Sequence, residues 1–229
     1  MEELSKKEIE EIRKNPDKTN WFAICWRPRL SEEFMREFSN KIDWPHISMH
    51  QELSEGFIRE FSDKVAWYEI SYCQKLSEGF IREFSDKVDW FHISYYQKLS
   101  EGFIREFSDK VDWENIFNCQ KLSEGFIREF IEKANWYYIS YNQKLSEEFI
   151  REFSDKVDWD NICHYQKLSE EFILEFYEKV DWNLLDKSEE YLNKLEEYLR
   201  KMNREQRLYM IMNYRKVWNK YEKKMEEKK

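Results

Sequence analysis

Apolar residues recur along this chain with one fixed period. Tryptophan returns every 23 residues, in an unbroken series made of Trp21, Trp44, Trp67, Trp90, Trp113, Trp136, Trp159 and Trp182. Between successive tryptophans the same order of apolar and polar residues comes back almost unchanged. A fixed period of this length is typical of repeat proteins, whose stacked units bury one continuous core. The pattern therefore predicts a tandem array of small units.

Residues 99 to 121 represent the unit, and their pattern predicts two short helices. Ser100 is a suitable N-cap for the first helix, with Leu99 and Ile104 placed to form a hydrophobic staple. Asp112 is a suitable N-cap for the second helix, which we expect to be the shorter one. The chain has only 4 Gly and 3 Pro, which leaves little turn chemistry for strands. The expected fold is an all-α tandem helix-turn-helix solenoid of about eight 23-residue repeats with helical caps.

The first helix of the unit has one apolar side and one charged side. Its apolar residues recur at helical spacing and predict a buried stripe of Phe103, Ile104, Phe107 and Val111. Its charged residues are spaced as the intrahelical pairs Glu101–Arg105, Arg105–Asp109 and Glu106–Lys110. Such pairs usually indicate a solvated face, and each contributes only about 0.3–0.5 kcal/mol. We therefore expect burial against neighbouring repeats to supply the stability.

Both ends of the chain depart from the repeat. We expect residues 1–29 to form an N-terminal capping repeat, 30–182 seven tandem repeats, and 183–229 a C-terminal helical cap. The last repeat carries apolar Leu174 and Tyr177 on a normally charged side, so they need a cover. We expect that cover to be two amphipathic helices broken near Asn203. The apolar stripe predicted for the second of them is Leu208, Ile211, Trp218, Tyr221 and Met225.

Composition favours a soluble, cytoplasmic protein and disfavours several function classes. No stretch is apolar and long enough to cross a bilayer, and the N-terminus lacks the layout of a signal peptide. The four cysteines lie in non-adjacent repeats, too far apart for disulfides, so we expect them reduced. The net charge is −9 with both signs intermixed, which makes nucleic acid an unlikely partner.

Variation between repeats concentrates on the second helix. Counted from its tryptophan, the third, fourth and seventh residues are mostly Ile, Ser and Gln, whereas the first, second, fifth and sixth change from repeat to repeat. At about 100° per residue these two sets occupy opposite sides of the helix. In repeats two to seven the variable set has 24 positions, of which nine are Tyr or Phe, three are charged and none is Lys or Arg. This composition resembles the core of a protein interface.

We therefore predict that the variable side binds a protein or peptide partner. Its candidate contact residues are the rings of the set, namely His46, His50, Tyr68, Tyr72, Phe91, His92, Tyr95, Tyr96, Tyr137, Tyr138, Tyr141, His164 and Tyr165. Drift on a free surface and packing of the tyrosines on the next repeat are the alternative explanations. Two other functions stay open. One is binding of single-stranded RNA by ring stacking, and the other is a structural or oligomerising rod.

The sequence carries no recognisable catalytic chemistry. There is no Gly-rich phosphate loop, no nucleophile elbow and no cysteine beside a basic activator in a known motif. His46 and His50 share a helix face, but no third metal ligand is evident. We expect neither enzymatic activity nor a metal or other cofactor.

The unit resembles short Trp-containing helical repeats found in proteins of giant DNA viruses and some phages. The stretch that carries the likeness reads Leu-Ser-Glu-Glu-Phe-Ile-Arg-Glu-Phe-Ser-Asp-Lys-Val-Asp-Trp at 145 to 159. The stretch Lys14-Asn15-Pro16-Asp17-Lys18-Thr19-Asn20-Trp21 looks like a related version. The likeness covers roughly Leu4 to Trp182. It implies a repeat protein that engages host factors, and it brings no catalytic or ligand-binding residues with it.

Overall fold

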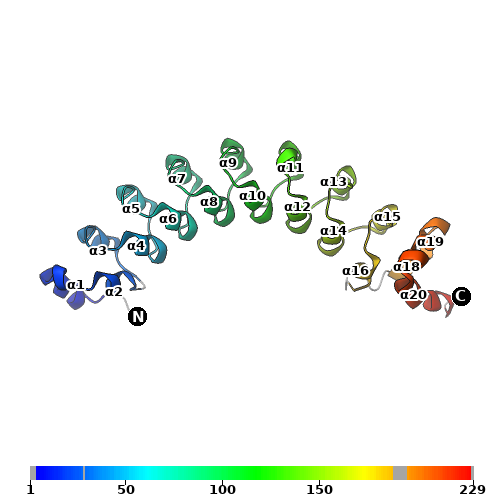
Figure 1. Cartoon of the computed structure of the whole chain (residues 1–229), viewed down its shortest axis with the longest axis horizontal. Helices are drawn as coiled ribbons and strands as arrows, with labels where there is room; N and C mark the ends of the chain where they lie inside the picture. The colour runs from blue at the N-terminus through cyan, green and yellow to red at the C-terminus, as the bar shows by residue number, and fades with distance from the viewer. Residues whose placement is uncertain (1–3, 28, 188–194, 228–229) are drawn as a thin grey trace. The chain divides into compact units, whose positions relative to one another are not determined.

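The computed structural model describes residues 4–27, 29–187 and 195–227, and every regular element among them is a helix (Figure 1). The chain is an all-α helical-repeat solenoid, as the 23-residue period predicts. It forms two compact units, residues 1–120 and 121–229, which are described separately below as units 1 and 2. Among the described residues, no helix combines the length and apolar character that a membrane crossing requires.

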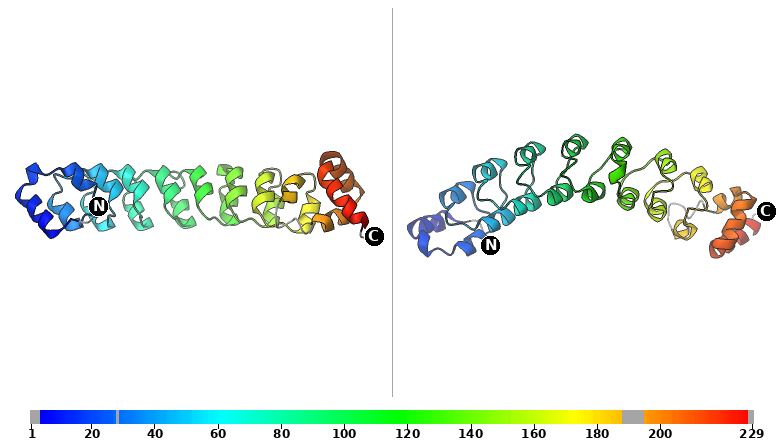
Figure 2. Two further views of the ribbon diagram at one scale, coloured as in Figure 1. Left: turned by 90° about the horizontal axis from the view of Figure 1, so that it is seen from below. Right: turned by 45° about the horizontal axis from the view of Figure 1, so that its top comes forward.

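Each repeat consists of a first and a second helix. In unit 1 the first helices are α1 (Lys6–Lys14), α3 (Glu32–Glu37), α5 (Glu55–Glu60), α7 (Glu78–Glu83) and α9 (Glu101–Glu106). The second helices there are α2 (Trp21–Cys25), α4 (Trp44–His50), α6 (Trp67–Cys73), α8 (Trp90–Tyr96) and α10 (Trp113–Cys119). A 3₁₀ turn, η1 (Pro16–Lys18), joins α1 to α2. The first helices lie in one row and the second helices in another (Figures 1 and 2).

Unit 2 continues the same alternation and then leaves it. Its first helices are α11 (Glu124–Glu129), α13 (Glu147–Glu152) and α15 (Glu170–Glu175). Its second helices are α12 (Trp136–Asn142), α14 (Trp159–Tyr165) and α16 (Trp182–Lys187), and η2 (Ile131–Lys133) precedes α12. In the described range 195–227 the helices are α18 (Leu195–Lys201), α19 (Arg204–Asn213) and α20 (Arg215–Glu227).

Both helices begin where the capping residues predict. The Ser100 hydroxyl accepts a hydrogen bond from the backbone N–H of Phe103 at 3.2 Å, and the Asp112 carboxylate accepts one from Asn115 at 2.9 Å. The prediction that the second helix is shorter is wrong, because α9 has 6 residues and α10 has 7. The first helix ends early since the backbone of Phe107 leaves the helical region, at φ −114° and ψ 32°. A turn then takes the chain to the next N-cap.

The core lies between the two rows and is built by every repeat in the same way. Phe80, Ile81 and Ile93 are 0% exposed, and their equivalents fill the same places along each unit. Trp90 lies against Phe107 of the following repeat at a ring-centroid distance of 4.9 Å. The predicted stripe is therefore buried apart from Phe107, which is half-buried under that tryptophan. Neighbouring repeats are held together by the constant side of the second helix.

Two constant polar residues also join consecutive repeats. The buried side chain of Gln97 accepts a hydrogen bond from Leu76 N–H at 3.0 Å and donates to the carbonyls of Gln74 at 2.8 Å and Ser71 at 3.3 Å. The Ser71 hydroxyl accepts from the backbone N–H of Asp89 at 2.9 Å. A buried polar group is costly unless it is hydrogen-bonded. The hydrogen bonds of this glutamine and serine meet that need, and they recur between other neighbouring repeats that carry the two residues.

The charged side of the first helices is a ladder between repeats. Arg82 donates to Glu106, 24 residues further along the chain, at 2.7 Å, and its guanidinium lies 5.0 Å from the centre of the Phe103 ring. The predicted Glu101–Arg105 pair forms at 3.7 Å. The predicted Glu106–Lys110 pair is wrong, because Glu106 bonds to Arg82 and Lys110 donates to the Ser85 carbonyl. Spacing within one helix does not reveal partners on the next one.

The final helices cover the exposed side of α15. Gln206 of α19 donates to the Leu174 carbonyl at 2.7 Å, and the rings of Tyr177 and Tyr209 lie 5.3 Å apart. The ring of Tyr177 is thus in contact with α19, as its apolar character predicts, and the bond at Leu174 is to the backbone. Asn203 caps α19, which confirms the predicted break there.

The helix predicted after that break is in fact two, α19 and α20. The backbone of Tyr214 separates them at φ −128° and ψ 42°. Of the predicted apolar stripe, Trp218 and Tyr221 are buried, whereas Leu208 is 50% exposed. In α19 the buried residue is Met210, at 0% exposure, and not the predicted Leu208. The side chain of Met225 lies outside the described residues.

Candidate partner-binding surface

The variable positions of the second helices are not all equally exposed. In α6 and α8 the first, fifth and sixth residues after the tryptophan face solvent, as Tyr68 at 57%, Tyr95 at 41% and Tyr96 at 48% show. The second residue lies between neighbouring second helices, and His92 there is only 8% exposed. The candidate contact residues thus divide into exposed, half-buried and buried groups. The exposed ones are His50, Tyr68, Tyr72, Phe91, Tyr95, Tyr96, Tyr137, Tyr141, His164 and Tyr165; His46 and Tyr138 are half-buried, and His92 is buried.

The densest group of exposed rings in unit 1 lies on α6 and α8. We call it the N-terminal ring cluster, and it consists of Tyr68, Tyr72, Phe91, Tyr95 and Tyr96. The Tyr72 ring contacts the Tyr96 ring of the next repeat edge-on at a centroid distance of 4.8 Å. Tyr95 lies 4.5 Å from Tyr96. Tyr72, Tyr95 and Tyr96 therefore each contact a neighbouring ring and are also exposed to solvent.

A buried histidine, His92, lies beneath this cluster and contacts two of its rings. His92 Nδ1 lies 2.8 Å from the Asp89 carboxylate, and the rings of Tyr68 and Tyr72 contact the imidazole at 4.5 and 5.3 Å. Partial burial works to raise the pKa of Asp89, but the hydrogen bonds from the backbone N–H and the ring of His92 lower it on balance. Asp89 therefore stays ionised at neutral pH. His92 acts as a spacer between repeats and offers little surface to a partner.

The first repeats carry a second group of rings that the sequence prediction did not include. Phe22 and Trp26 of the N-terminal segment are 58% and 44% exposed. Trp26 contacts both His46 and His50, at centroid distances of 5.0 and 4.8 Å. The set of variable positions in repeats two to seven does not include residues 1–29, which the sequence predicts to be a cap. The signal was present, because Phe22 and Trp26 occupy the same first and fifth places after Trp21.

Unit 2 carries a smaller cluster on α12 and α14. Tyr141 lies 4.3 Å from Tyr165 of the next repeat, which repeats the relation between Tyr72 and Tyr96. A hydrogen bond with Tyr141 raises the pKa of the Tyr165 hydroxyl. Tyr137 contacts the half-buried Tyr138 at 5.4 Å. His164 lies beside Tyr165, with ring centroids 4.5 Å apart.

Helix α10, at the end of unit 1, has no ring at its variable positions. Glu114, Asn118 and Cys119 take the outward places, and Asn115 is buried with its amide 3.5 Å from the Phe91 carbonyl. The N-terminal ring cluster therefore ends at Tyr96 within unit 1. A polar repeat of this kind limits how far an apolar contact extends along the row.

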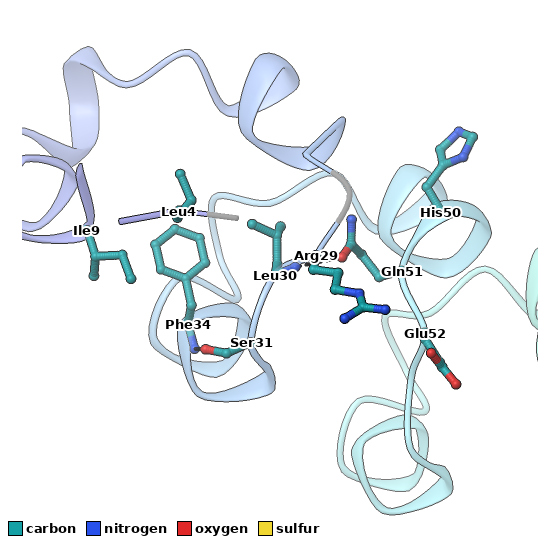
Figure 3. A pocket seen from close by; sticks show the side chains of 9 residues that line it. All are labelled: Leu4, Ile9, Arg29, Leu30, Ser31, Phe34, His50, Gln51 and Glu52. Carbon is teal, nitrogen blue, oxygen red and sulfur yellow. Dashed lines mark hydrogen bonds between the residues drawn. The ribbon is translucent and has the colours of Figure 1, made fainter. Parts of the chain in front are cut away.

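Two hollows open at the ends of the second helices in unit 1. The larger, of about 650 Å³, has an apolar wall of Leu4, Ile9, Leu30 and Phe34, with Arg29, His50 and Glu52 at its edge (Figure 3). The smaller, of about 370 Å³, lies between the loops that follow α4 and α6. Its lining includes Met49, His50, Cys73 and Lys75, which places a lysine beside the variable positions.

The geometry does not assemble a metal centre or a reactive thiol here. The rings of His46 and His50 lie 5.7 Å apart, and among the described residues no group of three metal-ligating side chains forms. All four cysteines are free, with Cys25 and Cys163 buried and Cys73 and Cys119 exposed. Burial raises the pKa of the Cys163 thiol to about 12, which makes it a poor nucleophile.

The comparisons with known proteins identify no relative. No family model, no curated protein and no solved structure matches this chain. The surface described above therefore has to be interpreted from its own geometry.

Proposed function

We propose that this chain is a non-catalytic repeat scaffold that binds a protein or peptide partner through the exposed rings of its second helices. The observation that carries the proposal is the N-terminal ring cluster, whose five rings are between 41% and 57% exposed. Most other exposed positions along these repeats are charged or small. Contiguous exposed apolar groups in a chain with 37% charged residues mark a place where another molecule is bound.

The contacts among the rings support binding by a rigid surface. The rings of Tyr72 and Tyr96 are in contact across the repeat boundary, and the ring of Tyr95 contacts that of Tyr96. A side chain that is already fixed loses little conformational entropy when a partner covers it. Tyrosine also supplies a large apolar area with a hydroxyl at its end, which suits interfaces that are partly polar.

The four free cysteines bear on where such a scaffold works. Free thiols persist in a reducing compartment. We place the binding activity in the cytoplasm on this ground.

A selection experiment tests the proposed function. A display library of short random peptides is panned on the full chain and, in parallel, on a variant with Tyr68, Tyr72, Tyr95 and Tyr96 all changed to alanine. We expect peptides that bind the unaltered chain and are lost on the variant. A control variant, Asp63→Ala with Asp86→Ala, changes two exposed residues after the first helices and should retain the same peptides.

Two outcomes of the selection would contradict the proposed function. If no peptide is enriched, or if the enriched peptides bind the tyrosine variant as well as the unaltered chain, the proposal fails. Circular dichroism of each variant confirms that the helices are intact before binding is compared. If single-stranded oligonucleotides bind through the same tyrosines and peptides do not, the rings serve base stacking and the protein partner is excluded.

A further inference from the structure

Two rows of lysines run along the repeats of unit 1, and the fold uses only one of them for its own packing. In the first row, Lys64 donates to Asn40 at 3.1 Å and Lys87 donates to the Ser62 carbonyl at 3.2 Å. The Lys87 ammonium also lies 5.7 Å from the centre of the Trp67 ring. These lysines connect the turns that follow the first helices of neighbouring repeats, so their charge is already engaged.

The second row has no such internal role. Lys75 and Lys98 follow the C-caps of α6 and α8, and both are exposed. Neither forms a hydrogen bond or an ion pair with any residue that the structure describes. A lysine just beyond a helix C-terminus interacts favourably with the helix dipole by about 0.3–1 kcal/mol, and that interaction leaves the ammonium open to solvent. Their charge remains available to an external ligand.

This second row follows the C-terminal ends of α6 and α8, the two helices that carry the N-terminal ring cluster. Lys75 lines the smaller hollow together with Cys73 and His50, which occupy variable positions of α6 and α4. Lys98 follows Tyr96, a member of the cluster, by two residues. The row also contains one reversal of sign, because Glu52 takes the place of lysine after α4. From α2 to α8 this position is occupied by Arg29, Glu52, Lys75 and Lys98, so its charge along unit 1 is positive, negative, positive, positive.

We propose, on the basis of the proposed function, that the partner is an extended peptide segment that runs along the second helices of unit 1 and carries two acidic residues three positions apart. Its carboxylates pair with Lys75 and Lys98, and an apolar side chain between or beside them lies on Tyr72, Tyr95 and Tyr96. The repeat spacing gives the register. Packed helices lie about 8–10 Å apart, and an extended chain advances about 3.3 Å per residue, so three residues span one repeat.

The reversal at Glu52 favours a peptide over a polyanion. A nucleic acid carries a phosphate on every nucleotide, so it would place negative charge against the exposed Glu52. A peptide can change sign along its length. The segment that fits best has a basic residue opposite Glu52, three positions from the acidic residue that meets Lys75.

Charge reversal tests the inference with the full chain. The random-peptide library is panned on the unaltered chain, on Lys75→Glu with Lys98→Glu, and on a control, Lys6→Glu with Lys7→Glu, which makes the same change of charge on the exposed first turn of α1. We expect the unaltered chain and the control to enrich peptides with Asp or Glu three positions apart. The Lys75→Glu, Lys98→Glu variant should enrich Lys or Arg at those positions.

Affinity measurements on the enriched acidic peptides give the size of the effect. Exposed ion pairs contribute about 0.2–1 kcal/mol each, so we expect the double charge reversal to weaken binding about fivefold or more. Replacing both acidic residues of a peptide by their amides should weaken its binding to the unaltered chain and leave its binding to the charge-reversed variant less affected.

The possible failures are distinct. Enriched peptides that depend on the tyrosines but show no acidic preference, or the same preference on the charge-reversed variant, overturn this inference and leave the proposed function standing. Absence of any tyrosine-dependent peptide overturns both. Binding of single-stranded RNA that is lost on Lys75→Glu with Lys98→Glu would assign the lysine row to phosphates and also overturn the inference.

Discussion

The side-chain oxygen of Gln74 accepts a hydrogen bond from the backbone N–H of Leu53, at the start of its own repeat, at 3.1 Å. The amide nitrogen of the same side chain donates to the carbonyls of Gln51 and Ser48 at 2.8 and 2.9 Å. One buried side chain therefore satisfies one backbone group of its own repeat and two of the preceding repeat. Leaving such groups unpaired in the core is costly, so we expect this residue type to contribute strongly to cohesion between repeats.

Replacing Gln74 by leucine keeps the side chain bulky but removes all three hydrogen bonds. We expect the unfolding free energy to fall by about 2 kcal/mol or more, because each unsatisfied buried group costs about 1–3 kcal/mol. Urea unfolding followed by circular dichroism measures the change. The adjacent Lys75→Ala, at an exposed position, should shift stability by less than about 0.5 kcal/mol. Equal urea midpoints for the two variants would show that the hydrogen bonds of the Gln74 side chain do not stabilise the fold.

The Arg59–Glu83 pair tests the charge ladder between first helices. The two groups meet at 2.6 Å, but both are partly exposed, so solvent screens them. A double-mutant cycle with Arg59→Ala and Glu83→Ala should give a coupling energy of about 0.2–1 kcal/mol. The intrahelical Arg59–Glu55 pair, at 3.7 Å, should couple less. We expect 1 M NaCl to reduce the first coupling, and a coupling unaffected by salt would argue against an ionic origin.

Stability should depend on pH through two acidic groups that join the first repeats. Hydrogen bonds from Arg13 lower the pKa of Glu37, and a hydrogen bond from Lys41 lowers the pKa of Asp17. A carboxyl whose folded-state pKa is lowered stabilises the fold above its unfolded pKa, which is about 4. That contribution disappears as the pH falls through the lower, folded-state value.

Urea unfolding at pH 7, 4 and 3 measures this dependence. The variant Arg13→Met with Lys41→Met removes both partners, so we expect it to start less stable at pH 7 and to lose less stability on acidification. Lys6→Met with Lys7→Met serves as the charge-matched control and should follow the unaltered chain. Parallel curves for the two variants would contradict the assignment of these pairs.

Thiol labelling distinguishes the two classes of cysteine. Cys163 is 1% exposed and burial raises its pKa to about 12, and Cys25 is 0% exposed, so neither should react with a thiol reagent in the folded state. Cys73 and Cys119 are exposed and should react. We expect two thiols to be modified before unfolding and four after it. Rapid modification of all four would mean that the second helices open readily.

The sequence predicts the fold because the signals for each helix are local. Ser100 and Asp112 cap helices within their own repeat, and the tryptophan period alone identifies the stacking. The contacts that join repeats are less accessible, since they depend on how one helix lies beside the next. The pairing of Glu106 with Arg82 is an example, because two acceptable partners exist in the sequence and only three-dimensional packing selects one.

The candidate surface was predicted in part for the same reason. Opposite sides of a helix follow from its period, so Tyr68, Tyr95 and Tyr96 are exposed as expected. His92 differs because the neighbouring second helix covers its position, which helical geometry within one repeat does not reveal. Lys75 and Lys98 follow the end of the second helix, so the division of that helix into a constant and a variable side does not include them.

The uniform bonding of Gln74, Gln97 and Gln120 has a consequence for how such a chain changes size. Each amide donates to carbonyls 23 and 26 residues before it, so the partners are interchangeable between neighbouring units. If residues 75–97 were excised, Gln120 would meet the carbonyls of Gln74 and Ser71 in place of its present partners. Recombination within the gene can therefore shorten or lengthen the protein by whole units without leaving a defective junction, whereas a one-residue insertion would break the register.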